Sequence, residues 1–278
     1  MNLTVQDGLT ALTAKLAAGG IDGAGREARL ILSHILDTTP DRMSLIARDP
    51  LASDLLDRAL GLATRRAGGT PMSHILGHRD FWGRRFEVTA DVLDPRPETE
   101  TLIAAALAVP FASVLDLGTG SGCILLTLLA ERLPARGLGA DLSDAALAVA
   151  RRNAAALGVA DRARLIRSDW FAEISGSFDL IVSNPPYIAA EEMPALAPEL
   201  SFEPRMALTD ERDGLTAYRA ITAGAGAHLT PGGRLMVEIG WQQGAAVAEL
   251  FQQAGLSGVQ ILPDLDGRDR VVSGQHPG

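Results

Sequence analysis

Three motifs place polar side chains directly after apolar runs of the sequence. Residues 114–124 form the first, in which an apolar run enters a glycine-rich turn and leads into another apolar segment, Val-Leu-Asp-Leu-Gly-Thr-Gly-Ser-Gly-Cys-Ile. The second motif is Asp141, which follows residues 137–140, and the third is Asn-Pro-Pro-Tyr at 184–187, which follows residues 178–183. Ligands of open α/β sheets bind outside the carboxyl ends of the strands, so the three motifs are candidates for a single site.

The glycine-rich turn lets a ligand approach the backbone closely. Gly118, Gly120 and Gly122 can adopt positive φ, but their spacing is GxGxG rather than the dinucleotide pattern GxGxxG, and Cys123 stands where that pattern has glycine. With no pyrophosphate to hold, such a loop suits the amino-acid end of S-adenosylmethionine. The carboxylate of Asp116 would attract the sulfonium and ammonium charges of that molecule.

Two further positions fit the rest of the same cofactor. Asp141, about 20 residues past the turn, can accept both ribose hydroxyls as a bidentate carboxylate. In Ser168-Asp169-Trp170, Asp169 can accept from the exocyclic amine of an adenine, and Trp170 offers a flat apolar face. A glycine turn alone would favour an ordinary turn, with Asp141 competing with Ser143 as a helix cap, but Asp141 and Trp170 together favour a cofactor site. From these residue types, the predicted cofactor contacts are Asp116, Gly118, Gly120, Gly122, Asp141 and Trp170.

The third motif has the groups needed to activate a planar nitrogen. An amide or aniline-like nitrogen is a poor nucleophile, so an enzyme must orient its lone pair by accepting hydrogen bonds from both of its N–H groups. The Asn184 side-chain carbonyl can accept one and the Pro185 backbone carbonyl the other, while Pro185 and Pro186 stiffen the loop and Tyr187 stacks on the target. These four residues predict in-line transfer of a methyl group with no metal and no covalent intermediate, whereas the alternative interpretation is a rigid proline turn.

The apolar pattern of the segment before these motifs predicts a helical bundle. Apolar residues recur at three- and four-residue steps from Thr4 to about Ala67, and glycine pairs at 19–20 and 68–69 are typical helix stops. Residues His74–Leu76 and Phe86–Val88 then predict two short strands of a hairpin. We expect a helical domain at residues 1–70, a hairpin linker at 71–92 and a methyltransferase domain at 93–278.

The last part alternates apolar strands with helical segments, which predicts a parallel α/β sheet covered by helices. Two final extended runs are separated by only six residues, too few for a helical crossover, so they should pair antiparallel. The fold class is therefore a Rossmann-like α/β sheet of seven strands, mostly parallel with one antiparallel edge strand. Its candidate strands are Ser113–Leu117, Gly137–Ala140, Arg164–Ile166, Leu180–Ser183, Arg234–Ile239, Gly258–Leu262 and Asp269–Ser273.

The composition limits which partners the protein is expected to bind. A net charge of −9 argues against a protein that holds nucleic acid by neutralising many phosphates. The single cysteine, Cys123, excludes an internal disulfide. The five histidines form no ligand cluster except a possible pair, His74 and His78, which favours a role in a loop over a metal, so no metal site is expected. The sequence has no run of about 20 apolar residues, so we expect a cytoplasmic protein with no membrane contact. It shows no interface pattern, so a monomer is the default.

The motifs together resemble the release-factor glutamine methyltransferase family, also called HemK or PrmC. The resemblance rests on residues 114–124, Asp141, FDLIVSNPPYI at 178–188 and PGGRLMVEIGWQQ at 231–243, with HILGHRDFWGRRFEV at 74–88 and LDPRPETE at 93–100. It implies methylation of the N5 side-chain amide of the glutamine in the Gly-Gly-Gln motif of peptide chain release factors, with S-adenosylhomocysteine as the second product. It also implies that Asn184 through Tyr187 grip that glutamine and that the helical substrate-docking domain of residues 1–70 helps to dock the release factor. The cofactor contacts that it implies are Gly118 to Gly122, with Thr119 and Ser121 among them, Asp141, Trp170 and Asn184.

Several positions keep open roles within this resemblance. His74 stands where a tyrosine is usual and Asp94 where an isoleucine is usual, and both are expected to affect packing only. Arg96 and Glu98 either contact the charged ends of the cofactor or brace the domain interface. Residues 202–205, including Glu203, and residues 213–215 resemble segments that shape the peptide channel. The sequence does not say which release factor is preferred. It also leaves open that the methylated glutamine belongs to a ribosomal protein.

Three rival functions share part of this pattern. DNA adenine-N6 methyltransferases use Asn-Pro-Pro-Tyr on a flipped-out adenine, but the acidic charge and the absence of a basic stripe disfavour them here. A cofactor-binding docking protein of the translation machinery would keep Asp141 and would not need Asn184. A nicotinamide-dependent dehydrogenase is disfavoured by the GxGxG spacing and by the lack of a candidate catalytic histidine or lysine near a strand end.

Overall fold

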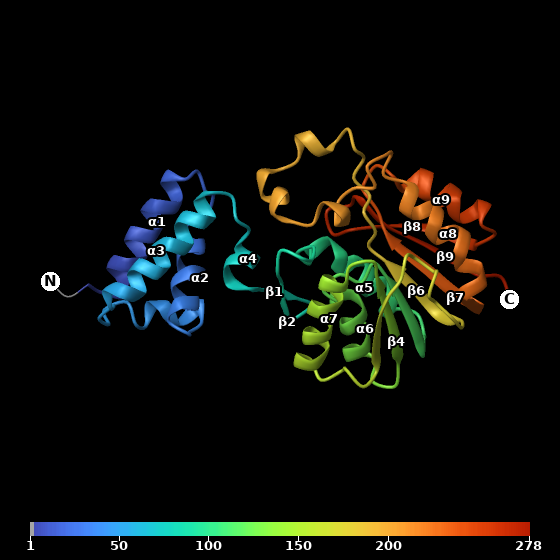
Figure 1. The fold of residues 1–278 in the computed structure, drawn as a ribbon, viewed down its shortest axis with the longest axis horizontal. Coiled ribbons are helices and arrows are strands. Elements are labelled where there is room, and N and C mark those ends of the chain that lie inside the picture. The colour runs from blue at the N-terminus through green and yellow to red at the C-terminus, as the bar shows by residue number, and fades with distance from the viewer. Residues whose placement is uncertain (1–2) are drawn as a thin grey trace. The chain divides into compact units, whose positions relative to one another are not determined.

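The computed structural model describes residues 3–278, and within them the chain forms two compact units (Figure 1). The first unit consists of the chain up to Gly77 together with Pro198–Phe202. The second consists of His78–Ala197 and Glu203–Gly278. The first unit therefore includes a short segment that belongs, by chain order, to the middle of the second.

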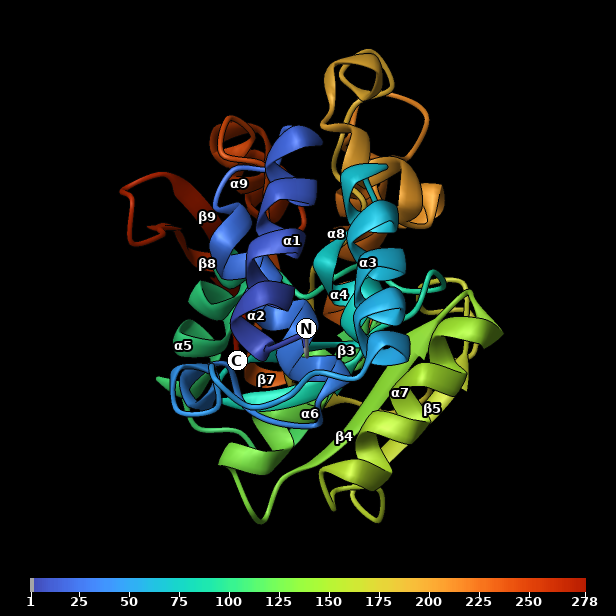
Figure 2. The ribbon, with the colours of Figure 1, turned by 90° about the vertical axis from the view of Figure 1, so that its left-hand side faces the viewer.

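The first unit is a small helical bundle in which α1 packs against both α2 and α3 (Figure 2). Thr4 and Asp7 begin α1 with a capping box, since each side chain accepts from the backbone N–H of the other. The core is a cluster of aliphatic side chains that includes Leu12, Leu16 and Ile31. The helices are α1 (Val5–Ala18), α2 (Ala24–Ile35), the 3-10 helix η1 (Pro40–Ser44), α3 (Ser53–Ala67) and α4 (Met72–Leu76). The helical prediction is confirmed, and Gly19 and Gly68 are the C-caps of α1 and α3.

The inserted segment, η4 (Pro198–Phe202), is bound to this bundle by an ion pair. Arg66 of α3, whose side chain is 9% exposed, contacts Glu199 at 2.5 Å and Glu27 of α2 at 2.7 Å. The aromatic ring of Phe202 lies over Gly69. No periodicity in the sequence indicated this return of the chain, because the contacts join residues more than 130 positions apart.

The hairpin forms, but one of its predicted strands is wrong. Residues His74–Leu76 belong to helix α4, and the strands are β1 (His78–Phe81) and β2 (Arg84–Glu87), paired antiparallel. The carbonyl of Pro71 accepts the N–H groups of His74 and Ile75, which starts a helical turn, and Gly77 ends that turn at φ 75°. A left-handed glycine directly after a short apolar run is a helix stop, and the strand can begin only after it.

The second unit contains a seven-stranded sheet in the order β5-β4-β3-β6-β7-β9-β8. Pairs among β5, β4, β3, β6 and β7 are parallel, while β9 runs antiparallel to both β7 and the outermost strand β8. The predicted fold class is confirmed, and the reversed strand lies one position inside the edge. The strands are β3 (Ser113–Leu117), β4 (Arg136–Asp141), β5 (Ala163–Arg167), β6 (Phe178–Ser183), β7 (Leu229–Glu238), β8 (Ser257–Pro263) and β9 (Asp269–Gln275).

Helices cover both faces of this sheet (Figure 1). Alternate residues of a strand point to opposite faces, so Val114, Leu180 and Met236 join the core beneath α5 and α6, whereas Leu115 and Ile181 join the core beneath α8 and α9. The continuous apolar character of the central strands follows from this two-sided burial. The helices of the unit are η2 (Pro97–Thr99), α5 (Glu100–Leu107), α6 (Cys123–Glu131), α7 (Asp144–Ala156), η3 (Met193–Ala195), η5 (Arg205–Ala207), α8 (Thr216–His228) and α9 (Gly244–Gln253).

Candidate active site

A cavity of about 310 Å³ opens at the carboxyl ends of β3, β4 and β6 in the second unit. Residues from all three sequence motifs line it, as the shared sheet edge requires. The predicted site residues in its wall are Gly118, Thr119, Gly120, Ser121, Asp141, Trp170, Asn184 and Pro186. The remaining four, Asp116, Gly122, Pro185 and Tyr187, lie behind this wall.

The glycine turn uses the left-handed conformation at each of its three glycines. Gly118, Gly120 and Gly122 have φ values of 70°, 54° and 81°. A Cβ on Gly118 or Gly120 would meet no atom within 4 Å, whereas one on Gly122 would lie 2.8 Å from Cδ1 of Leu126. The first two glycines therefore keep the approach to the cavity open, and the third lets the turn pack onto helix α6.

Asp141 holds the glycine turn through its side chain. Oδ2 accepts the backbone N–H of Gly120 at 2.8 Å, and Oδ1 accepts that of Ser143 at 2.9 Å. Burial raises the pKa of Asp141, and the hydrogen bonds from Ser143 and Gly120 oppose that rise. Each carboxylate oxygen keeps a second lone pair. The ribose role of Asp141 stays a prediction, and the carboxylate can serve it without releasing the loop.

Asp116 is fully buried beneath the turn and does not line the cavity. Its Oδ2 accepts the Thr119 hydroxyl at 2.6 Å, and Oδ1 has no hydrogen-bond partner within residues 3–278. Burial raises the pKa of Asp116 to about 7, against the opposing effect of the Thr119 hydrogen bond. Asp116 therefore reaches the cavity only through its charge, whereas Thr119, which donates to it, lies in the cavity wall.

Trp170 lines the cavity from a strained backbone conformation. Its φ is 47°, in the left-handed region that a bulky residue rarely adopts. Ser168 stabilises that turn, because its hydroxyl donates to the Trp170 carbonyl at 2.8 Å and accepts the N–H of Glu173 at 3.1 Å. Asp169 is exposed beside it and also lines the cavity. Strain of this kind clusters at ligand sites, which is consistent with the predicted adenine face.

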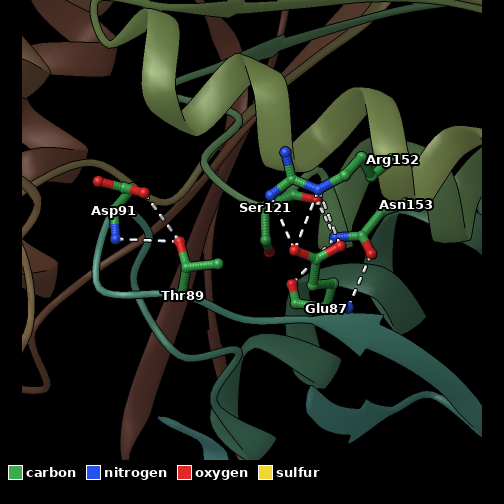
Figure 3. Close-up of polar contacts among 6 residues, drawn as sticks. All are labelled: Glu87, Thr89, Asp91, Ser121, Arg152 and Asn153. Carbon is green, nitrogen blue, oxygen red and sulfur yellow. Dashed lines mark hydrogen bonds and ion pairs between the residues drawn. The ribbon is translucent and has the colours of Figure 1, made fainter. Parts of the chain in front are cut away.

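The buried side chain of Asn153 joins the glycine turn to the hairpin (Figure 3). Its Nδ2 donates to the carbonyls of Ser121 at 2.9 Å and Glu87 at 3.1 Å, and its Oδ1 accepts the N–H of Glu87 at 2.7 Å. The next residue, Arg152, forms an exposed ion pair with the Glu87 carboxylate at 2.8 Å. Helix α7 thus fixes two segments that flank the cavity.

Hydrogen bonds from two other segments of the chain hold the Asn-Pro-Pro-Tyr loop in place. The Asn184 Nδ2 donates to the Thr99 hydroxyl at 3.3 Å, and the Gln243 Nε2 donates to the Tyr187 carbonyl at 2.9 Å. Pro185 is buried. The Tyr187 ring packs against the core beneath α8 and α9 and does not line the cavity. Stacking of Tyr187 on a planar target stays a prediction. In this conformation its ring packs toward the core and away from the cavity.

Both parts of the chain match known families. Residues 7–77 match the PrmC N-terminal domain and residues 93–214 the Methyltransferase small domain. A Release factor glutamine methyltransferase of Cereibacter sphaeroides is 59% identical over 272 residues, which are 98% of either chain. The chain belongs to the release factor glutamine methyltransferase family. Proteins of that name from Rhodospirillum rubrum and Caulobacter vibrioides are 46% and 44% identical, over 93% and 99% of this chain and 81% and 97% of theirs. The family predicted from the sequence is confirmed, and the enzyme is a methyltransferase.

Solved structures of lower identity support the fold. A methyltransferase from Pyrococcus furiosus superimposes with a TM-score of 0.55 at 17% identity, over 71% of this chain and 91% of its own. The catalytic domain of hMettl16 gives a TM-score of 0.59 at 17% identity, over 78% of this chain and 81% of its own. At such identity these similarities concern the architecture of the sheet and its helices. Within residues 3–278, no helix is long and apolar enough to cross a membrane.

In this methyltransferase, Asp94 contributes to the cavity wall, so the expectation that it affects packing only is wrong. It is 4% exposed, its Oδ2 lies 3.8 Å from Nη1 of Arg79 and 3.9 Å from Nη1 of Arg96, and its Oδ1 has no hydrogen-bond partner in the described chain. Arg96 also contacts Glu203 at 2.5 Å. The Arg96–Glu203 pair therefore joins the segment before η2 to the segment after η4.

Sequence reasoning missed the residues that support the site. Thr99, Asn153 and Gln243 each fix a predicted site residue through a buried or half-buried hydrogen bond. Thr99 and Gln243 lie inside segments that carry the family resemblance, which was the available signal. Asn153 lies in an Ala-rich helix, and a lone asparagine on the buried face of such a helix is the signal that could have found it.

Proposed function

We propose that this methyltransferase transfers the methyl group of S-adenosylmethionine to the side-chain amide nitrogen of the glutamine in the Gly-Gly-Gln motif of a peptide chain release factor. The observation that carries the proposal is Asn184, a neutral amide at the end of β6 whose NH2 group is already bound to Thr99 in the wall of the cavity. Its carbonyl oxygen is then turned away from Thr99 and is the acceptor that the proposal assigns to the substrate. The relatives of nearly equal length that carry the name release factor glutamine methyltransferase support the choice of substrate.

The cavity suits the cofactor on three counts. Its volume of about 310 Å³ lies within the usual range for small-molecule sites, roughly 300–1,000 Å³. The turn at Gly118 and Gly120 leaves room for a close approach, and the buried carboxylate of Asp116 provides negative potential beneath it. Asp141 and Trp170 line the same cavity as acceptor and flat face. When bound, the cofactor supplies an electrophilic methyl group on a sulfonium.

The protein's contribution to the reaction is orientation. The Asn184 carbonyl and the Pro185 carbonyl accept the two N–H groups of the glutamine amide, so the nitrogen lone pair is turned toward the methyl donor. The buried ring of Pro185 and the half-buried ring of Pro186 restrict the backbone, so these acceptors need no reorganisation. The new C–N bond forms as the S–C bond breaks, and the displaced amide proton passes to solvent.

A DNA adenine substrate is the less favoured alternative. The same four loop residues would suit an adenine amine. The chain nevertheless carries a net charge of −9, and its first unit matches the PrmC N-terminal domain. A duplex-binding enzyme needs a basic surface to neutralise phosphates. We further propose that the enzyme acts in the cytoplasm as a monomer without stable binding to nucleic acid.

Transfer of label from methyl-labelled S-adenosylmethionine tests the proposal. The acceptors are a purified release factor, its Gly-Gly-Ala variant, a ribosomal protein fraction and duplex DNA. Label on the natural release factor alone supports the proposed substrate. Equal label on the Gly-Gly-Ala variant, or label on the ribosomal fraction or the DNA only, would assign the enzyme to a different acceptor.

A further inference from the structure

Two segments that lie far apart in the sequence contribute to the wall of the cavity. One consists of residues 90–96, before η2, and the other begins at Pro204 and includes Met206 and Ala207 of η5. An ion pair joins the two segments, since Nη2 of Arg96 lies 2.5 Å from Oε1 of Glu203, the residue before Pro204. One part of the cavity wall is therefore fastened to another part of it by a single pair of charges.

The segment that carries η5 is anchored differently at its two ends. After η5, the N–H of Ile188 donates to the Leu208 carbonyl at 3.0 Å, and Ile188 and Thr209 form a parallel bridge. The next residue, Asp210, accepts the first N–H of helix α8 at 2.9 Å. Before η5, the segment is held by the side chain of Glu203. Loss of that ion pair would release the start of the segment while its end stays anchored, so η5 would move about a hinge near Leu208.

The two charges of the pair differ in exposure. The Glu203 side chain is 2% exposed, whereas that of Arg96 is 32% exposed. Burial raises the pKa of Glu203, and the positive charge of Arg96 opposes that rise. The cost of removing a carboxylate from water and the gain from a close ion pair nearly cancel in such positions. The closed arrangement should therefore differ little in free energy from one in which the segment moves outward and both groups are hydrated.

We propose that the Arg96–Glu203 ion pair is a clasp that keeps residues 204–207 against the bound cofactor and limits the rate at which the cofactor and its product leave. Glu203 is a positioning residue, because it does not line the cavity and acts through the wall residues that follow it. Every turnover exchanges S-adenosylhomocysteine for S-adenosylmethionine, so the clasp must open once in each cycle. The proposal rests on the binding of the cofactor in this cavity, as proposed above, and does not depend on which acceptor is methylated.

The dissociation rate of S-adenosylhomocysteine tests the clasp without methyl transfer. Stopped-flow fluorescence can follow it, because Trp170 lines the cavity. Glu203→Gln keeps the shape of the side chain and removes its charge, and it should make dissociation about tenfold faster. Glu211→Gln is the matched control, since Glu211 forms an exposed ion pair with Arg205 of the same segment and does not line the cavity, and its rate should stay within about twofold of the natural one. Equal rates for the two variants would overturn the proposal.

Arg96→Gln breaks the same pair from its exposed side and provides a second test if Glu203→Gln does not fold. The variant with both substitutions should release the product no faster than the faster of the two single variants, because either change opens the clasp. Effects that multiply in the double variant would overturn the proposal. S-adenosylmethionine should be released faster by a similar factor, since the clasp acts on the wall and not on the sulfonium. A change confined to S-adenosylmethionine would assign Glu203 an electrostatic role instead and would also overturn the clasp.

Hydrogen exchange tests the motion of the segment in the absence of any ligand. The N–H groups of Ala207 and Leu208 donate to the carbonyls of Pro204 and Arg205 at 2.9 Å and 3.0 Å. These two amides should exchange faster with water in Glu203→Gln than in the natural chain or in Glu211→Gln. Unchanged exchange would overturn the clasp, whatever acceptor the enzyme methylates. Failure of the natural enzyme to label any release factor would instead count against the proposed function alone.

Discussion

The side-chain amide of Asn153 donates a hydrogen bond to the Ser121 carbonyl across 2.9 Å, which joins helix α7 to the glycine turn. The same side chain exchanges two further hydrogen bonds with the backbone of Glu87. Since Asn153 is 1% exposed, water cannot replace it at any of these three groups. One buried amide thus positions part of the glycine turn and the end of the hairpin.

Asn153→Ala is expected to lower the free energy of unfolding by about 3 kcal/mol, because it leaves buried backbone groups without partners. Urea unfolding of the full chain measures this. The control is Arg152→Ala at the neighbouring position, whose exposed ion pair with Glu87 should contribute no more than about 1 kcal/mol. Equal losses in the two variants would contradict the assignment of the stabilising contact to Asn153.

Alanine substitutions at two glycines of the turn should affect folding and cofactor binding differently. Gly122→Ala places a Cβ 2.8 Å from Leu126 and should lower the unfolding midpoint. Gly120→Ala meets no atom of the protein, so it should cost only about 1–2 kcal/mol of backbone strain and weaken cofactor binding by intruding on the cavity. Thermal unfolding and calorimetric titration with S-adenosylmethionine measure the two effects. If Gly120→Ala bound the cofactor normally, the proposed path of the ligand over the turn would be wrong.

Asp116 should make stability depend on pH in a defined direction. Burial raises its folded pKa to about 7 from an ordinary value of 3.8, so its contribution is fully present below the unfolded pKa and is lost as pH rises through the folded pKa. Asp116→Asn should therefore become more stable relative to the natural chain by about 3 kcal/mol between roughly pH 5 and pH 8. Denaturant unfolding at several pH values gives the difference. A constant difference would indicate that Asp116 titrates normally.

The raised pKa of Asp116 also predicts how cofactor binding depends on pH. Ionised Asp116 attracts the positive charges of S-adenosylmethionine, and this attraction is lost when Asp116 is protonated below about pH 7. The dissociation constant should therefore rise as pH falls from about 8 to 6 in the natural enzyme and stay nearly flat in Asp116→Asn. Binding of S-adenosylhomocysteine, which lacks the sulfonium charge, serves as the comparison and should vary less. Parallel pH curves for both proteins would remove Asp116 from the cofactor's electrostatics.

Much of the fold could be predicted from sequence because its signals are local. Apolar runs such as Ser113–Leu117 gave strand bounds that the structure reproduces, and the short link before Asp269 indicated the antiparallel pair. The error at His74–Leu76 came from a three-residue run whose length cannot distinguish strand from helical turn. The return of Pro198–Phe202 to the helical unit depends on the contact between Arg66 and Glu199, and no local pattern encodes that contact.

Residues that line the cavity could be predicted where a side chain of suitable chemistry lies at the end of a strand, as Asp141 and Asn184 do. The same reasoning could not distinguish residues that line the cavity from residues that support it. Asp116 and Tyr187 were predicted as contacts, yet both lie behind the wall, because burial depends on neighbours from other elements. Asp94 is the converse case, since its place in the wall depends on how the segment before η2 packs.

Tandem mass spectrometry of the release-factor peptide that contains Gly-Gly-Gln tests the central claim most directly. After incubation with S-adenosylmethionine and the natural enzyme, we predict one added methyl group on the glutamine side-chain amide. With Asn184→Ala, at a concentration of S-adenosylmethionine that saturates the variant, we predict an unmodified peptide. A methyl group on another residue, or equal modification by both enzymes, would contradict the assignment of Asn184 as the group that orients the glutamine.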